Sequence, residues 1–289
     1  MWLVFAFGSA FFAGITAVLA KIGIRQTDST LATALRTIVV LLFSWLMVFI
    51  VGSQATIGQI EAQTLVFLIL SGLATGASWL CYFRALQLGD VNRVAPVDKS
   101  STVMTMLLAM MLLGEPLTAG KAVGIVIIGA GTWLMAAPKT PPSADKGMSH
   151  GNRWFLFAFL SAVFASLTAI LGKVGIQNIE SNLGTAIRTI VVLVMAWLMV
   201  FVTGKQREIR HIDRRSWLFL LLSGITTGLS WLCYYRALQD GQASIVVPID
   251  KLSILITVFF SYRLLKEKLT RKGLAGLVLI TAGTLVLLW

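Results

Sequence analysis

Ten long apolar runs, separated by short polar connectors, constrain the fold of this chain more than any other feature. A helix rises about 1.5 Å per residue, so a run of about 20 residues crosses the hydrocarbon core of a bilayer. The expected spans are 2–24, 31–51, 65–88, 91–113, 118–137, 154–176, 183–203, 216–238, 243–265 and 270–289. We therefore expect an all-α integral membrane protein with ten transmembrane helices.

The composition supports a chain that lies in lipid. Of the 289 residues, 57 % are hydrophobic and 12 % are charged, whereas soluble domains carry about 25 % charged residues. The continuous apolar runs exclude a β-barrel, whose strands are short and alternating. The net charge of +12 would suggest nucleic acid in a soluble protein. In a membrane protein the position of each charge relative to the bilayer matters more, so no nucleic-acid partner is expected.

The second half of the sequence repeats the first without a gap at an offset of 152 positions. The offset aligns Trp2 with Trp154, Arg36 with Arg188, Pro96 with Pro248 and Glu115 with Glu267. A proline-rich polar segment separates the copies. We predict a five-helix repeat at 1–137, a polar cytoplasmic linker at 138–153 and a second five-helix repeat at 154–289. A natural duplication and a fusion of two half-size proteins both account for this pattern.

Five spans is an odd number, so the two repeats must cross the membrane in opposite directions, as inverted repeats of transporters do. Basic residues indicate the direction, because cytoplasmic loops carry excess Lys and Arg. Residues 53–64 contain no Lys or Arg, whereas the equivalent residues 205–216 contain five. This difference places 205–216 and the linker in the cytoplasm and both termini outside, with the reversed orientation as the alternative. We expect a multi-pass protein of the cell (plasma or inner) membrane.

Several basic residues lie inside the apolar spans, where a charged side chain costs about 2.5–3.5 kcal/mol on insertion scales. Four of them lie close enough to span ends to reach the interface, namely Lys21, Arg84, Lys173 and Arg236. Arg36 and Arg188 lie deeper, each in the context RTIVV. We take Arg36, Arg188, Arg84 and Arg236 as candidate substrate contacts, and interfacial anchoring is the alternative for Arg84 and Arg236.

The strongest polar motif is VAPVDKSS at 94–101, repeated as VVPIDKLS at 246–253. Each copy has an Asp–Lys pair after a proline, which removes a backbone donor and loosens a helix. Transporters bind substrate at such broken helices. The candidate binding or gating residues are Asp98, Lys99, Ser101, Asp250, Lys251 and Ser253. The aspartates are expected gate partners or proton acceptors and the lysines substrate contacts. In the structural alternative, Asp98 pairs with Arg84 or Arg36.

Aromatic and glycine residues recur just before this motif, in SWLCYFRALQ at 78–87 and SWLCYYRALQ at 230–239. Two aromatic pairs with a spacing of three share a helix face, Trp79 with Tyr82 and Trp231 with Tyr234. Substrate contact and packing are the two interpretations of these rings. The GxxxG pairs predict close helix packing at Gly72, Gly76, Gly224 and Gly228.

No catalytic or metal-binding constellation is found in the sequence. The two cysteines, Cys81 and Cys233, lie in apolar runs, and the two histidines, His150 and His211, lie in polar connectors. None has a metal-binding spacing. We expect neither an enzyme nor a cofactor or metal. The excess of basic over acidic residues within the spans favours an anionic or zwitterionic substrate.

The end of each repeat resembles the EamA-type members of the drug/metabolite transporter superfamily, which have ten helices in two five-helix repeats. The matching segments are GEPLTAGKAVGIVIIGAG at 114–131 and KEKLTRKGLAGLVLITAG at 266–283, where Glu115 and Glu267 match the acidic residue of the family. The resemblance implies a secondary transporter of small organic solutes, such as amino acids or related metabolites. Transport would proceed by alternating access through a central cavity between the repeats.

The resemblance leaves the substrate and one point of topology open. Family members usually place both termini in the cytoplasm, opposite to the charge-based orientation. The alternatives are a flippase or transporter of lipid-linked or phosphorylated sugars, and a non-transporting membrane scaffold. A monomer suffices to enclose a path, and a homodimer is also compatible with the sequence.

Overall fold

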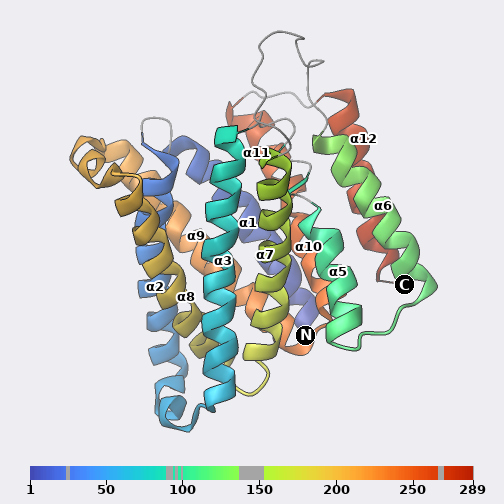
Figure 1. The fold of residues 1–289 in the computed structure, drawn as a ribbon, viewed down its shortest axis with the longest axis horizontal. Coiled ribbons are helices and arrows are strands. Elements are labelled where there is room, and N and C mark those ends of the chain that lie inside the picture. The colour runs from blue at the N-terminus through green and yellow to red at the C-terminus, as the bar shows by residue number, and fades with distance from the viewer. Residues whose placement is uncertain are drawn as a thin grey trace. The chain divides into compact units, whose positions relative to one another are not determined.

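The computed structural model describes residues 1–23, 27–88, 94, 97–98, 100–136, 153–265 and 270–288, and this part of the chain contains helices and no β-strand. The first half contains α1 (Trp2–Gly23), α2 (Ser29–Val51), the 3-10 helix η1 (Ser53–Gln59), α3 (Ala62–Leu88), α5 (Ser101–Leu112) and α6 (Ala119–Ala136). The second half contains α7 (Arg153–Gly175), α8 (Ser181–Val202), η2 (Lys205–His211), α9 (Arg214–Asp240), α10 (Ala243–Lys251), α11 (Ser253–Leu265) and α12 (Arg271–Val286) (Figure 1).

Seven helical segments among the described residues are long and apolar enough to cross a membrane. They are Trp2–Ala20, Ser29–Val51, Ala62–Tyr82, Arg153–Gly175, Ser181–Val202, Arg214–Asp240 and Ala243–Phe260. Shorter apolar helices occur at Ser101–Leu112 and Ala119–Leu134. Large apolar side chains such as Phe49, Val202 and Phe259 are exposed on these helices, as expected where the solvent is lipid. The predicted class, an all-helical multi-span membrane protein, is confirmed.

Repeated capping residues determine where the second helix of each repeat begins and ends. The carboxylate of Asp28 accepts hydrogen bonds from the backbone of Thr30 and Leu31 at the start of α2. Glu180, at the equivalent position, caps α8 in the same way. At the other end, Gly52 and Gly204 adopt left-handed backbone with φ of 79° and 70°, which leads α2 into η1 and α8 into η2. The two repeats therefore use the same local signals.

Glycine contacts show that the repeats are inverted. An added Cβ at Gly224 would lie 2.6 Å from Cβ of Val39, and one at Gly228 would lie 2.8 Å from Cδ1 of Phe43. Residue numbers rise together along this contact, so α9 and α2 are parallel. Successive spans of one repeat alternate in direction, so a second helix can be parallel to a third helix only when the repeats are inverted. Figure 1 shows η1 and η2, which follow α2 and α8, at opposite ends of the helices.

The first repeat makes the equivalent glycine contact. An added Cβ would lie 2.7 Å from Cβ of Val191 at Gly72 and 2.6 Å from Cβ of Met195 at Gly76. These distances are shorter than real Cβ contacts allow, so larger residues would separate α3 from α8. The predicted close packing at the GxxxG pairs is confirmed.

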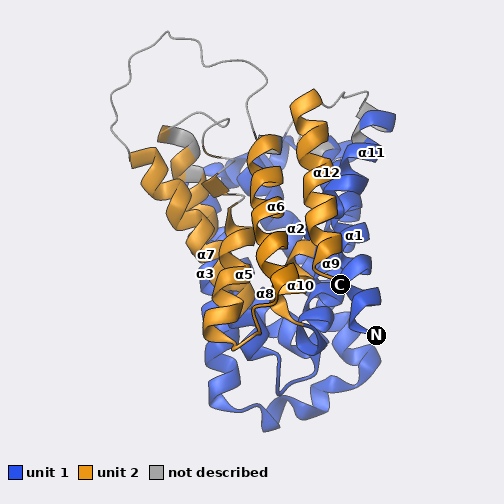
Figure 2. Cartoon of the chain, turned by 90° about the vertical axis from the view of Figure 1, so that its right-hand side faces the viewer, with its two compact units in different colours: residues 1–76, 171–241, 249–267 blue, residues 77–170, 242–248, 268–289 orange. Residues whose placement is uncertain are grey.

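The chain divides into two compact units, each built from both halves of the sequence (Figure 2). Unit 1 comprises Met1–Gly76, Leu171–Gly241 and Ile249–Glu267, and unit 2 comprises Ala77–Ile170, Gln242–Pro248 and Lys268–Trp289. In unit 1, α1 packs on α9 and α11, and α2 packs on α8 and α9. In unit 2, α6 packs on α12. Each unit therefore contains helices from both halves of the sequence.

Candidate functional site

Arg188 lies within α8 and is only 2 % exposed. Its Nε donates to Oγ of Ser71 at 2.9 Å and its Nη2 donates to Oγ1 of Thr75 at 2.6 Å. Ser71 and Thr75 are four residues apart on α3, so both hydroxyls lie on the same face of that helix. The third guanidinium nitrogen, Nη1, is buried without a hydrogen-bond partner. Arg188 is therefore held through two of its nitrogens, while the two N–H groups of Nη1 are unused.

Two aromatic rings of α9 complete the surroundings of Arg188. Its Cζ lies 5.2 Å from the centre of the Trp231 ring and 4.9 Å from that of Tyr235, within the range of cation–π attraction. Within the described part of unit 1, no carboxylate lies within 4.0 Å of this guanidinium. We call Arg188, Ser71, Thr75, Trp231 and Tyr235 the Arg188 cluster. It is a buried cation held by neutral groups.

Arg36, the equivalent of Arg188 in the first repeat, is less completely bonded. Its Nη2 donates to Oγ1 of Thr227 at 2.7 Å, while its Nε is buried without a partner. Ser223, the equivalent of Ser71, instead donates to the backbone oxygen of Leu220 at 3.0 Å. Both repeats thus contain the arginine, and among the described contacts Arg188 is held through two hydroxyls and Arg36 through one.

Asp250 is joined to the first helix of the other repeat. Its Oδ1 accepts a hydrogen bond from the hydroxyl of Ser9 at 2.6 Å, and the hydroxyls of Ser9 and Ser230 lie 3.3 Å apart. The ammonium of Lys251 is 3.9 Å from Oδ2 of Asp250. The Asp250 side chain is 17 % exposed, and that of Lys251 is 47 % exposed. Asp250 and Lys251 therefore form an ion pair with each other, and the lysine is the more exposed of the two.

The same serine–serine–aspartate arrangement occurs in unit 2. The hydroxyl of Ser161 donates to Oδ1 of Asp98 at 2.8 Å, and the Ser78 hydroxyl donates to the backbone oxygen of Ser161 at 3.1 Å. Ser9 and Ser161 were not among the residues predicted from the sequence. These two serines are 152 positions apart, as Asp98 and Asp250 are. A polar residue that occurs in both repeats of a membrane protein needs a partner, and this repetition could have identified the serines as site residues.

The helix around Asp250 is interrupted, as the repeated proline suggested, but not at the proline. Pro248 lies inside α10, and the interruption is at Leu252, whose amide donates to the backbone oxygen of Ile249 at 2.9 Å. Ser253 begins α11. In the first repeat, Ser101 begins α5, and the preceding residue makes the same tight turn. The predicted Lys99 and the residue Pro96 lie outside the described residues.

The remaining predicted residues differ in their surroundings. Tyr82 packs against the buried Ala85, Val94 and Ala158, which favours the packing interpretation for this ring. Trp79 and Tyr234 are half-buried, and Arg84 is exposed. Of the predicted rings, only Trp231 faces Arg188 in the described contacts, and its companion is Tyr235 rather than Tyr234. Spacings of three and four both share a face with Trp231, so the rotation of α9, which turns Tyr235 toward Arg188, decides between the two rings.

Glu115, the acidic residue that marks the family resemblance, caps a helix of the other repeat. Its carboxylate accepts hydrogen bonds from the amide of Ala243 at 2.6 Å, from the amide of Ser244 at 3.0 Å and from the Ser244 hydroxyl. The ammonium of Lys121 lies 3.8 Å away. An acidic group at the start of α10 is favourable because of the helix dipole. Glu267 lies outside the described residues.

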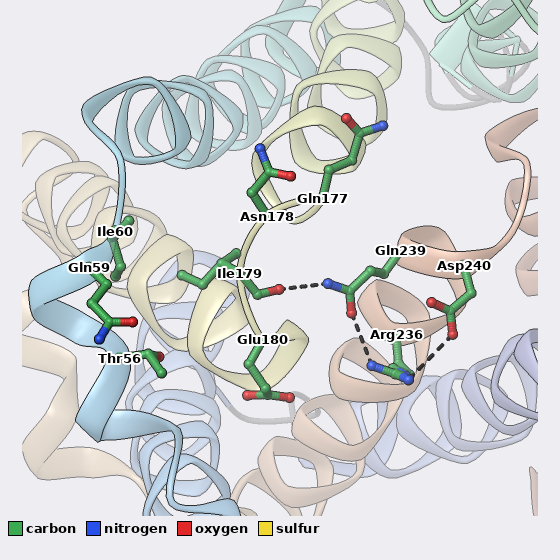
Figure 3. A pocket seen from close by; sticks show the side chains of 10 residues that line it. All are labelled: Thr56, Gln59, Ile60, Gln177, Asn178, Ile179, Glu180, Arg236, Gln239 and Asp240. Carbon is green, nitrogen blue, oxygen red and sulfur yellow. Dashed lines mark hydrogen bonds and ion pairs between the residues drawn. The ribbon is translucent and has the colours of Figure 1, made fainter.

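A polar pocket of about 620 Å³ lies in unit 1, between η1, the turn that joins α7 to α8, and the end of α9. It is lined by Thr56, Gln59, Ile60, Gln177, Asn178, Ile179, Glu180, Arg236, Gln239 and Asp240. Figure 3 shows Thr56 and Gln59 on one side of the pocket and Arg236, Gln239 and Asp240 on the other. We call this the η1 pocket. Of the predicted site residues, Arg236 belongs to it.

No group of three His, Cys, Asp or Glu side chains that could hold a metal ion occurs among the residues that the structure describes. Cys81 and Cys233 are free, half-buried thiols. The described site residues offer charged groups, hydroxyls, amides and aromatic rings.

A family model and a solved structure match nearly the whole chain, and curated relatives match parts of it. The model of the EamA-like transporter family matches residues 1–137 and 152–289. An "uncharacterized transporter in cobO 3'region" of Sinorhizobium sp. is 46 % identical over 134 residues, which are 46 % of this chain and 95 % of that protein. An uncharacterized transporter of Archaeoglobus fulgidus is 24 % identical over 230 residues, covering 79 % of this chain and 78 % of that one. A solved crystal structure with 16 % identity shares the fold, with a TM-score of 0.77 over 98 % of this chain and 95 % of its own.

Proposed function

This chain belongs to the EamA-like transporter family, and on that basis we propose that it is a secondary transporter of small organic solutes such as amino acids or related metabolites. It would act by alternating access between its inverted repeats, without ATP and without covalent chemistry. The sequence contains no phosphate-binding GxxxxGK[ST] loop. The energy would therefore come from the gradient of the solute or of a coupled ion.

The Arg188 cluster is the observation that carries this proposal. A buried charge without an ion pair costs several kcal/mol, and a fold that needed only stability would place an apolar residue there. The guanidinium offers a free Nη1, and its other nitrogens and two ring faces hold its plane. A carboxylate of the substrate would form a short, charge-assisted hydrogen bond to such a donor. We therefore propose an anionic or zwitterionic substrate.

The paired polar residues next to the helix interruptions supply the remaining proposed contacts. Lys251 and Ser253 flank the interruption at Leu252, and transporters bind substrate at such interrupted helices. We propose that Asp98 and Asp250 act as gate partners or proton acceptors and that Lys99, Lys251, Ser101 and Ser253 contact the solute. Arg36, Arg84, Trp79, Tyr82 and Tyr234 remain predicted members of the site.

We propose that the protein lies in the cell membrane with η1 outside and η2 in the cytoplasm, because η2 and the start of α9 carry the basic residues that η1 lacks. Cysteine variants test this orientation. A membrane-impermeant maleimide applied to intact cells should label Gln54→Cys in η1 and leave Arg207→Cys in η2 unlabelled. The opposite pattern would reverse the orientation.

A ligand screen tests the function. The purified protein is heated with amino acids, quaternary amines, sugar phosphates or nucleotide sugars, because a ligand of the folded state raises the melting temperature. Each hit is repeated with Arg188→Gln, Lys251→Met and, as a control, Arg210→Gln, which removes an exposed arginine of η2. The proposal predicts an amino acid or similar solute whose shift is smaller in Arg188→Gln than in the wild type and unchanged in Arg210→Gln. Stabilisation by nucleotide sugars alone would favour the lipid-linked or phosphorylated sugar alternative.

A further inference from the structure

The η1 pocket presents both signs of charge at one end of unit 1. Arg236 Nη2 lies 3.5 Å from Oδ2 of Asp240, and these side chains are 43 % and 41 % exposed. Both groups can therefore exchange part of this contact for a ligand. The volume of the η1 pocket, about 620 Å³, lies within the range of small-molecule sites, roughly 300–1,000 Å³. A solute with a carboxylate and an ammonium group has complementary charges.

The pocket wall is already held in place by hydrogen bonds. The side-chain amide of Gln239 donates to the backbone oxygens of Ile176 and Ile179, both at 2.6 Å. Its Oε1 accepts from Nη1 of Arg236 at 3.1 Å, as Figure 3 shows. The ammonium of Lys173 donates to carbonyls near the end of α9 and to that of Gly241, the residue after the helix, at 2.7 Å. Lys173 therefore fixes the end of α9, and a fixed wall lowers the entropy lost on binding.

Amide and hydroxyl groups line the rest of the pocket. Gln59 and Thr56 come from η1, and Gln177 and Asn178 come from the turn before α8. Each amide provides donors and acceptors. Glu180 contributes a further carboxylate, part of whose capacity is used to cap α8. Such a surface binds a water-soluble polar solute better than an apolar one.

At the equivalent position beside η2, ion pairs connect η2 to the start of α2. Lys205 of η2 lies 3.7 Å from Oδ2 of Asp28 and 2.8 Å from Oε1 of Glu208. In η1 the positions equivalent to Lys205 and Glu208 hold Ser53 and Thr56, which cannot form these ion pairs. The two repeats have therefore diverged at this position. Ion pairs of Lys205 hold η2 to the start of α2, whereas a pocket lies beside η1.

We propose that the η1 pocket is a recognition site for a small zwitterionic solute, which Arg236 binds by its carboxylate and Asp240 by its ammonium group. The site is separate from the Arg188 cluster and precedes it on the path from the side that carries η1. This inference rests on the proposed function, since it assigns the pocket to the entry or exit of the transported solute.

Binding of radiolabelled L-amino acids to the purified full-length protein tests the site. Each ligand found is compared with its N-acetyl derivative and its methyl ester, which remove the positive and the negative charge in turn. We expect both derivatives to bind at least tenfold more weakly. The variants Arg236→Gln and Asp240→Asn should each weaken binding of the amino acid about tenfold, since a charge-assisted bond contributes more than 1.4 kcal/mol. Arg210→Gln, the control in η2, should bind as the wild type does.

A second variant tests the pocket without removing its charged residues. The double substitution Ser53→Lys with Thr56→Glu introduces into η1 the residues that form the ion pairs of η2, with Glu180 in the position of Asp28. It should weaken amino-acid binding, while the melting temperature stays within a few degrees of the wild type. In proteoliposomes, Arg236→Gln should raise KM for solute supplied from the η1 side at least tenfold and leave kcat within twofold.

The outcomes separate the two proposals. Unchanged amino-acid binding in the pocket variants, with binding lost in Arg188→Gln, overturns the pocket and leaves the transporter standing. Equal binding of amino acid, ester and N-acetyl derivative overturns the zwitterion assignment. Transport of another solute class without amino-acid binding overturns it as well. Absence of transport for every solute class overturns the proposed function itself.

Discussion

Asp250 accepts a 2.6 Å hydrogen bond from Ser9, a residue of the other repeat. Its counterpart in unit 2, the bond from Ser161 to Asp98, measures 2.8 Å. Each bond joins the first helix of one repeat to an aspartate of the other repeat. This aspartate lies two residues after the proline that occurs in both repeats. Movement of one helix past the other along this contact would break the bond.

Replacing Ser9 by Ala should therefore be more damaging than removing an ordinary buried hydroxyl. A hydrogen bond to a charged group contributes about 1.5–3 kcal/mol, and we expect a corresponding fall in the free energy of unfolding, measured by thermal or denaturant unfolding in detergent. Ser166→Ala is the control, because the Ser166 hydroxyl bonds to a carbonyl of its own helix. An equal fall in the free energy of unfolding in both variants would show that the bond from Ser9 to Asp250 contributes no more than an ordinary hydroxyl bond.

Enlarging a contact glycine should separate two helices. Gly76→Leu in α3 would force its side chain against Met195, whose Cβ is 2.6 Å from an added Cβ. Overpacking of this kind costs about 1–3 kcal/mol, so the melting temperature should fall. Gly58→Ala in η1 is the control, since nothing lies within 4 Å of its added Cβ. A stable Gly76→Leu protein would contradict the packing described for α3 and α8.

Loss of Glu115 should destabilise α10 in the other repeat. Glu115→Ala leaves the amides of Ala243 and Ser244 without their acceptor, and an unsatisfied buried donor costs about 1–3 kcal/mol. Glu115→Gln keeps one acceptor oxygen and should lose less. Unfolding of the two variants relative to the wild type gives the comparison, and an equal loss in both would contradict the capping role.

The cap of α9 gives a pH dependence with a defined sign. A hydrogen bond from the Ser216 hydroxyl, together with the backbone amides of Ser216 and Arg215, lowers the pKa of Asp213. A lowered pKa in the folded state means that the stabilisation is complete above the unfolded-state value, about 3.9, and is lost as pH falls through the folded-state value. The difference in melting temperature between wild type and Asp213→Ala should stay constant from about pH 5 to 8 and shrink below about pH 4. A difference that grows on acidification would contradict the sign.

Much of the fold could be predicted from the sequence, because helix length, apolar runs and the repeat are local or periodic properties. The spans near 31–51 and 183–203 differ from α2 and α8 by about two residues, owing to the acidic caps Asp28 and Glu180. The interruption of the helix was expected near Pro248 and lies at Leu252. Pro248 has no amide hydrogen to donate, yet it lies inside α10, and the irregular turn comes four residues later.

The partners within the site could not be predicted from periodicity. Ser71 and Thr75 meet Arg188 because α3 packs on α8, and the ring of Tyr235 rather than that of Tyr234 faces the guanidinium because of how α9 is rotated. Spacing gives the residues that share a helix face, but the direction of that face depends on contacts between segments more than a hundred residues apart. Charged residues found alone in apolar spans were the reliable signal, since each requires a partner.

Counterflow in proteoliposomes tests the central claim most directly. Vesicles are loaded with an unlabelled solute found in the ligand screen, and uptake of the same labelled solute is followed for wild type, Arg188→Lys and Arg210→Gln. The account predicts rapid uptake by the wild type and Arg210→Gln, and a loss of at least tenfold in Arg188→Lys, because lysine keeps the charge but not the planar set of donors that Ser71 and Thr75 hold. Uptake by Arg188→Lys equal to that of the wild type would contradict the claim that this guanidinium binds the transported solute.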